Sequence, residues 1–120
     1  LGGGRLGLGL WLDHSVVEVL DRRPDELAQL GEEMEEARLY VFSLNAFPYG
    51  DFHSRVVKRD VYLPDWTEEA RLAYTVAAAR LLLRLAPSDL SEVSISTLPL
   101  GWGAGWDEAR GALACRRLIA

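Results

Sequence analysis

The segment Leu39–Leu44, LYVFSL, constrains the fold most, because it carries hardly any polar side chain. Strands that are apolar on both sides are typical of parallel sheets, in which both faces are covered. Two more strands are predicted, at Leu6–Leu12, where every second residue is leucine, and at Val93–Thr97. The chain is therefore expected to build a parallel sheet.

Helical patterns separate these strands. Apolar residues follow Pro24 at helical spacing, a second helix is predicted to begin with Thr67 as its N-cap, and another opens at Asp107. The helix after Thr67 is expected to bury an apolar stripe of Leu72, Val76, Ala79 and Leu83. This alternation predicts an α/β fold of about three consecutive βα units, with parallel strands adjacent in sequence order.

Composition argues against several kinds of partner. The chain of 120 residues is 49% hydrophobic, which suffices for one packed domain. A formal net charge of -5, without a dense Lys/Arg tract, argues against binding to nucleic acid. Arg80 and Arg84 interrupt the longest apolar stretch before it reaches the roughly 18 residues of a membrane-spanning helix, so no membrane insertion is expected. The single cysteine, Cys115, cannot form an internal disulfide, which favours a cytoplasmic location.

Polar and aromatic residues follow two of the predicted strands. Asn45, Tyr49 and His53 come after the second strand, and Thr97 and Trp102 lie at the end of the third. Because parallel strands end at the same edge of a sheet, these residues are predicted to cluster there. Ligand sites of α/β proteins lie at that edge, so the cluster is the candidate site.

Most of the polar residues also have a simpler interpretation. Asn45 either offers its amide to a polyol or a carbonyl group, or caps its own loop. His53 suits an acid, a base or a hydrogen-bonding group, and no second histidine stands at zinc-type spacing. Lys58 either belongs to a small basic group that binds a phosphate or carboxylate, or lies in a solvated loop. Ser94 and Ser96 share a strand face that either lines a polar interior or packs against backbone.

Three motifs resemble the EboE family of bacterial metabolite-traffic proteins: NAFPYGDFH at 45–53, VYLPDW at 61–66 and SISTLPLGW at 94–102. This family belongs to the xylose-isomerase-like TIM barrels, which are akin to sugar phosphate isomerases and epimerases. The resemblance runs from about Gly7 to the C-terminus and implies an eight-stranded barrel of ~250 residues or more. We therefore expect residues 1–120 to be a single incomplete domain, the N-terminal fragment of a TIM barrel.

The resemblance also implies a set of residues at the rim of the barrel. The matching positions are Asn45, Phe47, Pro48, Tyr49, His53, Lys58, Tyr62, Pro64, Trp66, Ser96, Thr97, Pro99 and Trp102. Substrate binding is expected of Asn45, Phe47, Tyr49, Lys58, Tyr62, Thr97 and Trp102, and catalysis of His53. Related sugar isomerases hold a divalent metal with acids and histidines on later strands. A metal in the full-length protein is thus expected to bind outside this chain, and no metal ligand is predicted within it.

Two functions from different classes remain open. The first is processing of a small-molecule precursor by metal-assisted proton transfer next to a carbonyl, as in isomerases and epimerases. The second is a noncatalytic carrier that holds an apolar metabolite, which the aromatic residues of the loop at 45–53 favour almost as well. Other proteins of the same metabolite-traffic pathway are the expected protein partners. A complete small α/β domain is a third interpretation, weakened by the absence of closing strands.

Overall fold

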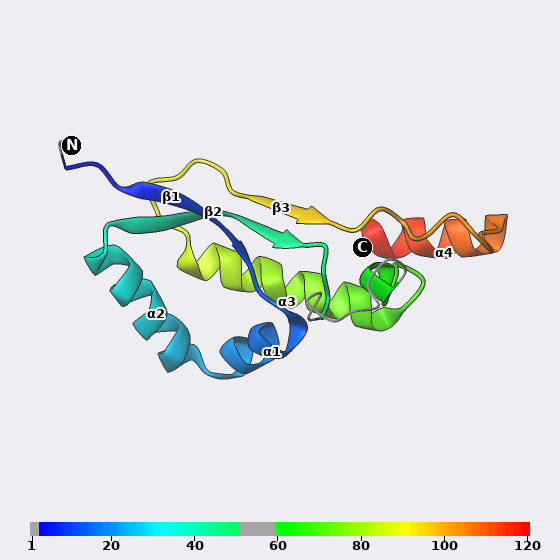
Figure 1. The fold of residues 1–120 in the computed structure, drawn as a ribbon, viewed down its shortest axis with the longest axis horizontal. Helices are drawn as coiled ribbons and strands as arrows, with labels where there is room; N and C mark the ends of the chain where they lie inside the picture. Colours follow the sequence, from blue (N-terminus) through cyan, green and yellow to red (C-terminus); the bar gives the residue numbers. More distant parts are fainter. Residues whose placement is uncertain (1–2, 51–59) are drawn as a thin grey trace.

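The computed structural model describes residues 3–50 and 60–120 (Figure 1). The elements follow the predicted alternation: β1 (Leu6–Trp11), α1 (His14–Arg22), α2 (Pro24–Glu36), β2 (Leu39–Ala46), the 3-10 turn η1 (Asp60–Tyr62), α3 (Glu69–Leu85), β3 (Ser94–Thr97) and α4 (Glu108–Leu118). β2 runs two residues further than predicted, and β1 and β3 are each one residue shorter. The protein is therefore an α/β protein, as predicted.

The three strands form one parallel sheet in the order β1-β2-β3, which confirms the predicted strand order. Leu8 pairs with Val41 and Gly9 pairs with Ser43, so Phe42 is an extra residue in β2. This bulge resets the alternation of side chains along the strand. As a result, Val41 and Leu44 are both buried although they are three positions apart.

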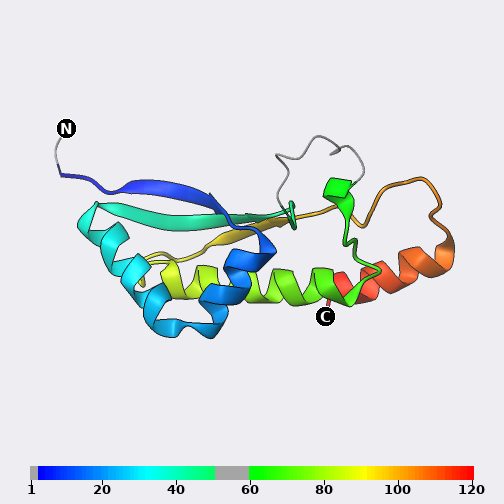
Figure 2. The same cartoon turned by 60° about the horizontal axis from the view of Figure 1, so that its bottom comes forward.

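All the helices that pack on the sheet lie on one of its faces, as Figure 2 shows. The core between these layers holds nine buried residues: Val17, Leu27, Val41, Leu44, Ala46, Tyr74, Ala78, Leu81 and Leu82. The opposite face of the sheet carries no helix within the described residues, and Phe42 there remains 43% exposed. That open face and the ends of the strands are the parts of the fold available to a ligand.

The buried face of α3 differs from the predicted stripe. Val76 is 43% exposed and Leu83 is 70% exposed, so both predictions were wrong. The side chains that face the core are instead those of Arg71, Tyr74, Ala78, Leu81 and Leu82. The reason is that α3 is apolar on nearly every side, so that spacing selects no single face. Two polar residues reach the core because backbone carbonyl groups there accept their hydrogen bonds.

The N-terminus of α3 also differs from the prediction. Its N-cap residue is Glu68, not Thr67, and the Glu68 side chain makes no capping hydrogen bond. The Thr67 hydroxyl donates instead to Asp65 Oδ1 in the preceding turn. A nearby carboxylate thus competes with the helix terminus for the threonine side chain.

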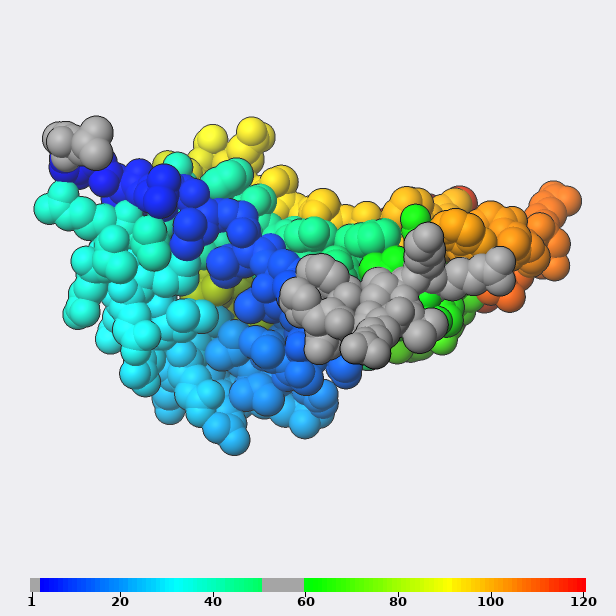
Figure 3. All heavy atoms as spheres, in the orientation of Figure 1, coloured from blue at the N-terminus to red at the C-terminus, as the bar shows by residue number. Residues whose placement is uncertain are grey.

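The last helix begins as predicted, because Asp107 is its N-cap and accepts a hydrogen bond from the Arg110 backbone. Figure 3 shows α4 and the loop before it (orange to red) extending beyond the sheet, in a molecule of 53 × 33 × 31 Å. A second apolar cluster of Trp66, Leu98 and Ala114 attaches this part to α3. Within 3–50 and 60–120, every helix is too short or too polar to cross a bilayer.

The two adjacent leucines of α3 provide a test of this face assignment. Leu82 is 2% exposed, so Leu82→Ala should lower the free energy of unfolding by about 2–5 kcal/mol. Leu83→Ala should cost less than about 0.5 kcal/mol, because the Leu83 side chain already lies in solvent. Urea denaturation of both variants measures the difference. Equal losses would mean that the predicted stripe is buried in solution after all.

Candidate functional site

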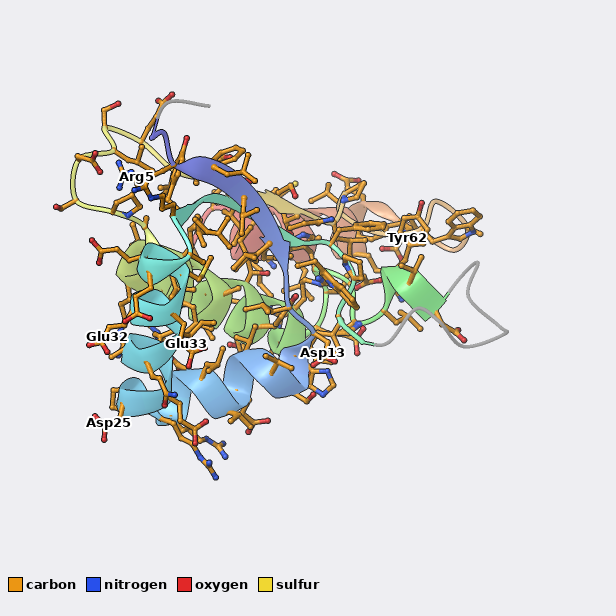
Figure 4. All side chains as sticks on the ribbon, turned by 60° about the vertical axis from the view of Figure 1, so that its left-hand side comes forward. Arg5, Asp13, Asp25, Glu32, Glu33 and Tyr62 are labelled. Atoms are coloured by element: carbon orange, nitrogen blue, oxygen red, sulfur yellow. The ribbon has the colours of Figure 1, made fainter. Side chains whose placement is uncertain are left out.

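The carboxyl ends of the three strands meet at one end of the sheet, as expected for parallel neighbours. Figure 4 shows the difference between the two ends of the molecule: Asp13 and Tyr62 lie toward one end and Arg5 toward the other. At the far end Arg5 pairs with Asp89 at 2.6 Å, and both side chains are well exposed. The acidic residues of α2 point into solvent, Glu32 and Glu33 among them (Figure 4). The strand ends therefore hold the candidate site.

A hollow of about 350 Å³ lies over the carboxyl-terminal half of the sheet. Its lining comes from all three strands: Gly9, Leu10, Trp11, Ser43, Leu44, Asn45, Ser94 and Ser96. A Cβ atom on Gly9 would lie 3.0 Å from the Ser43 hydroxyl oxygen. Glycine at this position therefore keeps a side chain of β1 from crowding the hydroxyl group in the hollow.

The amide of Asn45 has a fixed orientation. Its Oδ1 accepts hydrogen bonds from the Phe47 backbone N–H at 2.9 Å and from the Ser96 hydroxyl at 3.1 Å. Two donors occupy the carbonyl side of the amide, so the Nδ2 group with its two N–H donors must point the other way. Asn45 therefore caps its own loop, which is one of the two interpretations that the sequence left open, and its Nδ2 donors bond no residue that the structure describes.

Three residues predicted to bind substrate form an aromatic series in the connections that follow β2 and β3. The rings of Phe47 and Tyr62 lie 5.5 Å apart at 87°, and those of Tyr62 and Trp102 lie 5.0 Å apart at 62°. Edge-to-face contacts of this kind are favourable and directional. The series rests on the apolar cluster that contains Trp66 and Leu98. Residues from the connection after β2 and from the loop after β3 are thus brought together at one rim.

Other predicted residues lie elsewhere. Tyr49 packs on the helix side of the sheet, where its ring stacks on His14 at 4.2 Å and 8°. Thr97 also turns away from the hollow, and its hydroxyl oxygen is buried without a hydrogen-bond partner among the described residues. His53 and Lys58 lie outside the described residues. The predicted grouping of Asn45 with Tyr49 and Thr97 is therefore seen along the backbone but not among the side chains.

The sequence interpretation missed two side chains of the hollow that can form hydrogen bonds, Trp11 and Ser43. Trp11 donates its indole N–H to the Pro48 carbonyl oxygen at 3.1 Å, which joins the end of β1 to the loop after β2. Trp11 shares one face of β1 with Gly7 and Gly9, and this pattern in the sequence could have indicated its place in the hollow. Ser43 gave no signal, because only the bulge at Phe42 turns it toward the hollow.

Polar groups of α3 lie beneath these loops. The Tyr74 hydroxyl donates to the carbonyl oxygens of Leu12 at 2.6 Å and Pro48 at 3.2 Å. Burial raises the pKa of Tyr74 to about 12, although the positive charge of Arg71 opposes the shift. Burial likewise lowers the pKa of Arg71 from its ordinary value, and the neighbouring tyrosines and acids oppose that. The raised pKa keeps the Tyr74 hydroxyl protonated, and thus a hydrogen-bond donor, at neutral pH.

No metal-binding group is apparent in the described part of the chain, because no three His, Cys, Asp or Glu side chains converge there. The donor set of the hollow consists of neutral hydroxyl and amide groups, which bind sugars and other polar neutral molecules more readily than they hold a cation.

No protein-family model, curated protein or solved structure matches this chain.

The raised pKa of Tyr74 predicts a stability change at alkaline pH. Between pH 10 and about 12 the unfolded chain has lost this phenolic proton and the folded chain keeps it. Since the unfolded state then binds fewer protons, stability falls with rising pH, by up to about 1.4 kcal/mol per pH unit from this group. Tyr74→Phe should remove that part of the slope in urea titrations, whereas Tyr40→Phe should keep it. An unchanged slope in Tyr74→Phe would contradict the shifted pKa.

Proposed function

We propose that this chain is part of an EboE-type TIM barrel and binds a polyhydroxylated precursor at the carboxyl ends of its strands. The parallel sheet with its helices on one face supports this proposal, because βα barrels consist of such units with the helices outside. The proposed setting is cytoplasmic metabolite traffic, with other proteins of that pathway as partners. The proposed reaction class is that of sugar isomerases and epimerases.

The fixed amide of Asn45 is the observation that carries the proposal. Its free N–H donors share the hollow with the hydroxyl groups of Ser43, Ser94 and Ser96. Hydroxyl and amide groups arranged in this way match the alternating donors and acceptors of a polyol. Trp11 adds an aromatic side chain to the lining of the hollow.

Within this proposal the described residues bind and orient the substrate. Proton transfer next to a carbonyl needs an acid–base residue within hydrogen-bond reach of the reacting carbon. His53 is the proposed residue for that role and is not among the described residues. A divalent metal, when bound, would polarise the carbonyl group, and its ligands are proposed to lie on later strands of the full-length protein.

A second candidate function is a noncatalytic carrier of an apolar metabolite. The aromatic series Phe47–Tyr62–Trp102 favours it, because Trp102 remains 44% exposed and offers an apolar surface in the loop after β3. The two candidates differ in which group contributes most of the affinity. Polar groups of the hollow would dominate for a polyol, and the aromatic rings would dominate for an apolar ligand.

Calorimetric titration with D-xylulose and with farnesol distinguishes the two candidates. If the site binds polyols, D-xylulose should bind, and Asn45→Ala should raise its Kd about tenfold through lost hydrogen bonds. Trp102→Ala should change the D-xylulose affinity much less. For an apolar carrier the pattern reverses: farnesol should bind, and Trp102→Ala should weaken it more than Asn45→Ala.

Two matched controls lie away from the site. Ser91→Ala removes an exposed polar group just before β3, and Val76→Ala removes an apolar side chain of α3 with an exposed fraction of 43%, close to that of Trp102. Neither should alter either affinity. Binding of neither probe, or equal weakening by the control and site variants, would sink both candidates.

A further inference from the structure

Two polar side chains of α3 enter the space under the candidate site. Arg71 and Tyr74 lie one turn apart on the helix, and they are 0% and 5% exposed. The residues around them are mostly apolar, so ordinary core packing would place apolar side chains here. Their hydrogen bonds show what they do instead.

Arg71 joins the two segments that carry the first rings of the aromatic series. Its Nη1 donates to the carbonyl oxygens of Ala46 at 2.7 Å and Phe47 at 3.1 Å. Its Nε donates to the Pro64 carbonyl oxygen at 2.7 Å, two residues after Tyr62. One rigid guanidinium group therefore sets the distance between the end of β2 and the loop that follows η1.

Tyr74 makes the corresponding link on the other side. Its hydroxyl donates to carbonyl oxygens of Leu12 and Pro48, and Pro48 also accepts the indole N–H of Trp11. The phenol thus holds the end of β1 against the loop after β2. Between them, the two side chains of α3 hold the ends of β1 and β2, two of the three strands that line the hollow, and the segments that carry the first two rings of the series.

Burying Arg71 costs free energy that an apolar side chain at this position would not cost. Arg71 forms no ion pair with a described residue, and its Nη2 is buried with no partner there. Asp65 and Glu68 act on this charge only from beyond ion-pair distance. A buried charge with no carboxylate in contact is unfavourable, and a well-packed apolar side chain is often the more stable choice. Its two aromatic neighbours, Tyr49 and Tyr74, offset part of that cost through cation–π contacts at 5.8 and 5.7 Å. A role in site geometry explains why an arginine is present.

We propose that Arg71 and Tyr74 are positioning residues, which set the shape of the ligand site from beneath without touching the ligand. The ligand part of this inference rests on the proposed function, and the geometric part does not. Loss of either side chain should loosen the loops at 46–49 and 62–66 while the sheet and α2 keep their packing.

Amide hydrogen exchange under native conditions tests the geometric part directly. Arg71→Lys keeps the charge but replaces the planar guanidinium with an ammonium group that has no fixed fork of donors. In this variant the amides of Phe47 and Trp66 should exchange about fivefold faster or more, while that of Leu30 in α2 stays unchanged. Tyr74→Phe should have the same effect on Phe47 and serves as the decisive variant if Arg71→Lys does not fold.

If Arg71 and Tyr74 only stabilised the fold, their loss would change the amide exchange rates in a different pattern. Global destabilisation speeds the exchange of all slowly exchanging amides by one common factor. The matched controls are Arg80→Lys, an exposed arginine on the same helix that pairs with Asp21, and Tyr40→Phe on the open face. Neither should change exchange at Phe47. Equal acceleration at Phe47 and Leu30, or none at Phe47, overturns the proposal.

Titration with D-xylulose then separates this inference from the proposed function. Faster amide exchange at Phe47 alone, together with a D-xylulose Kd raised about fivefold or more, supports both the positioning role and the proposed function. Local acceleration in a protein whose parent chain binds neither D-xylulose nor farnesol supports the positioning role and rejects the proposed function. Local acceleration with unchanged affinity overturns the claim that these residues shape the ligand site.

Discussion

Parallel pairing of β1, β2 and β3 is the constraint on which the rest of the structure depends. Parallel neighbours cannot be joined by a tight turn, so each connection needs a helical crossover. Here α1 and α2 form the first crossover and α3 the second, and all three lie on the same face. No helix of the described residues covers the opposite face, and all three strands end at one edge. One pairing rule thus produces both the core and the place for a ligand.

The candidate site combines two kinds of chemistry within a few residues of backbone. Asn45 is the last exposed residue of β2 and presents amide donors to the hollow, and Phe47 begins the aromatic series two positions later. The change occurs where the strand ends, because backbone there leaves the sheet and can turn a side chain toward another loop. A ligand with a polyol part and an apolar part would use both surfaces together, and the titration with two probes measures which part dominates.

Period-two and helical patterns predicted β1 and most of the helices, because each of those elements has one apolar face. A continuous apolar run predicted β2, and the helices between the strands predicted the strand order. These patterns failed where the buried face of an element does not differ in polarity from its other faces. The buried side of α3 could not be read from its spacing, because Leu83 and Leu82 are equally apolar and only packing distinguishes them. The turn of Ser43 toward the hollow depends on a single extra residue, Phe42, and no sequence pattern marks such a bulge. Side-chain placement at the site was therefore less predictable than its backbone.

Arg71 and Tyr74 are polar residues in an otherwise apolar core, and their position in the fold is informative. Both lie under the carboxyl ends of the strands, whereas the arginine at the opposite end of the sheet, Arg5, stays exposed and pairs with Asp89. If buried polarity served stability alone, nothing would restrict it to the end where ligand sites form in α/β folds. Departures from consistent local design are expected at functional sites, where geometry is maintained at some cost to stability. The carbonyl oxygens that these two side chains hold belong to the loops that carry Trp11 and Phe47, so the cost is incurred where it fixes the geometry of the candidate site.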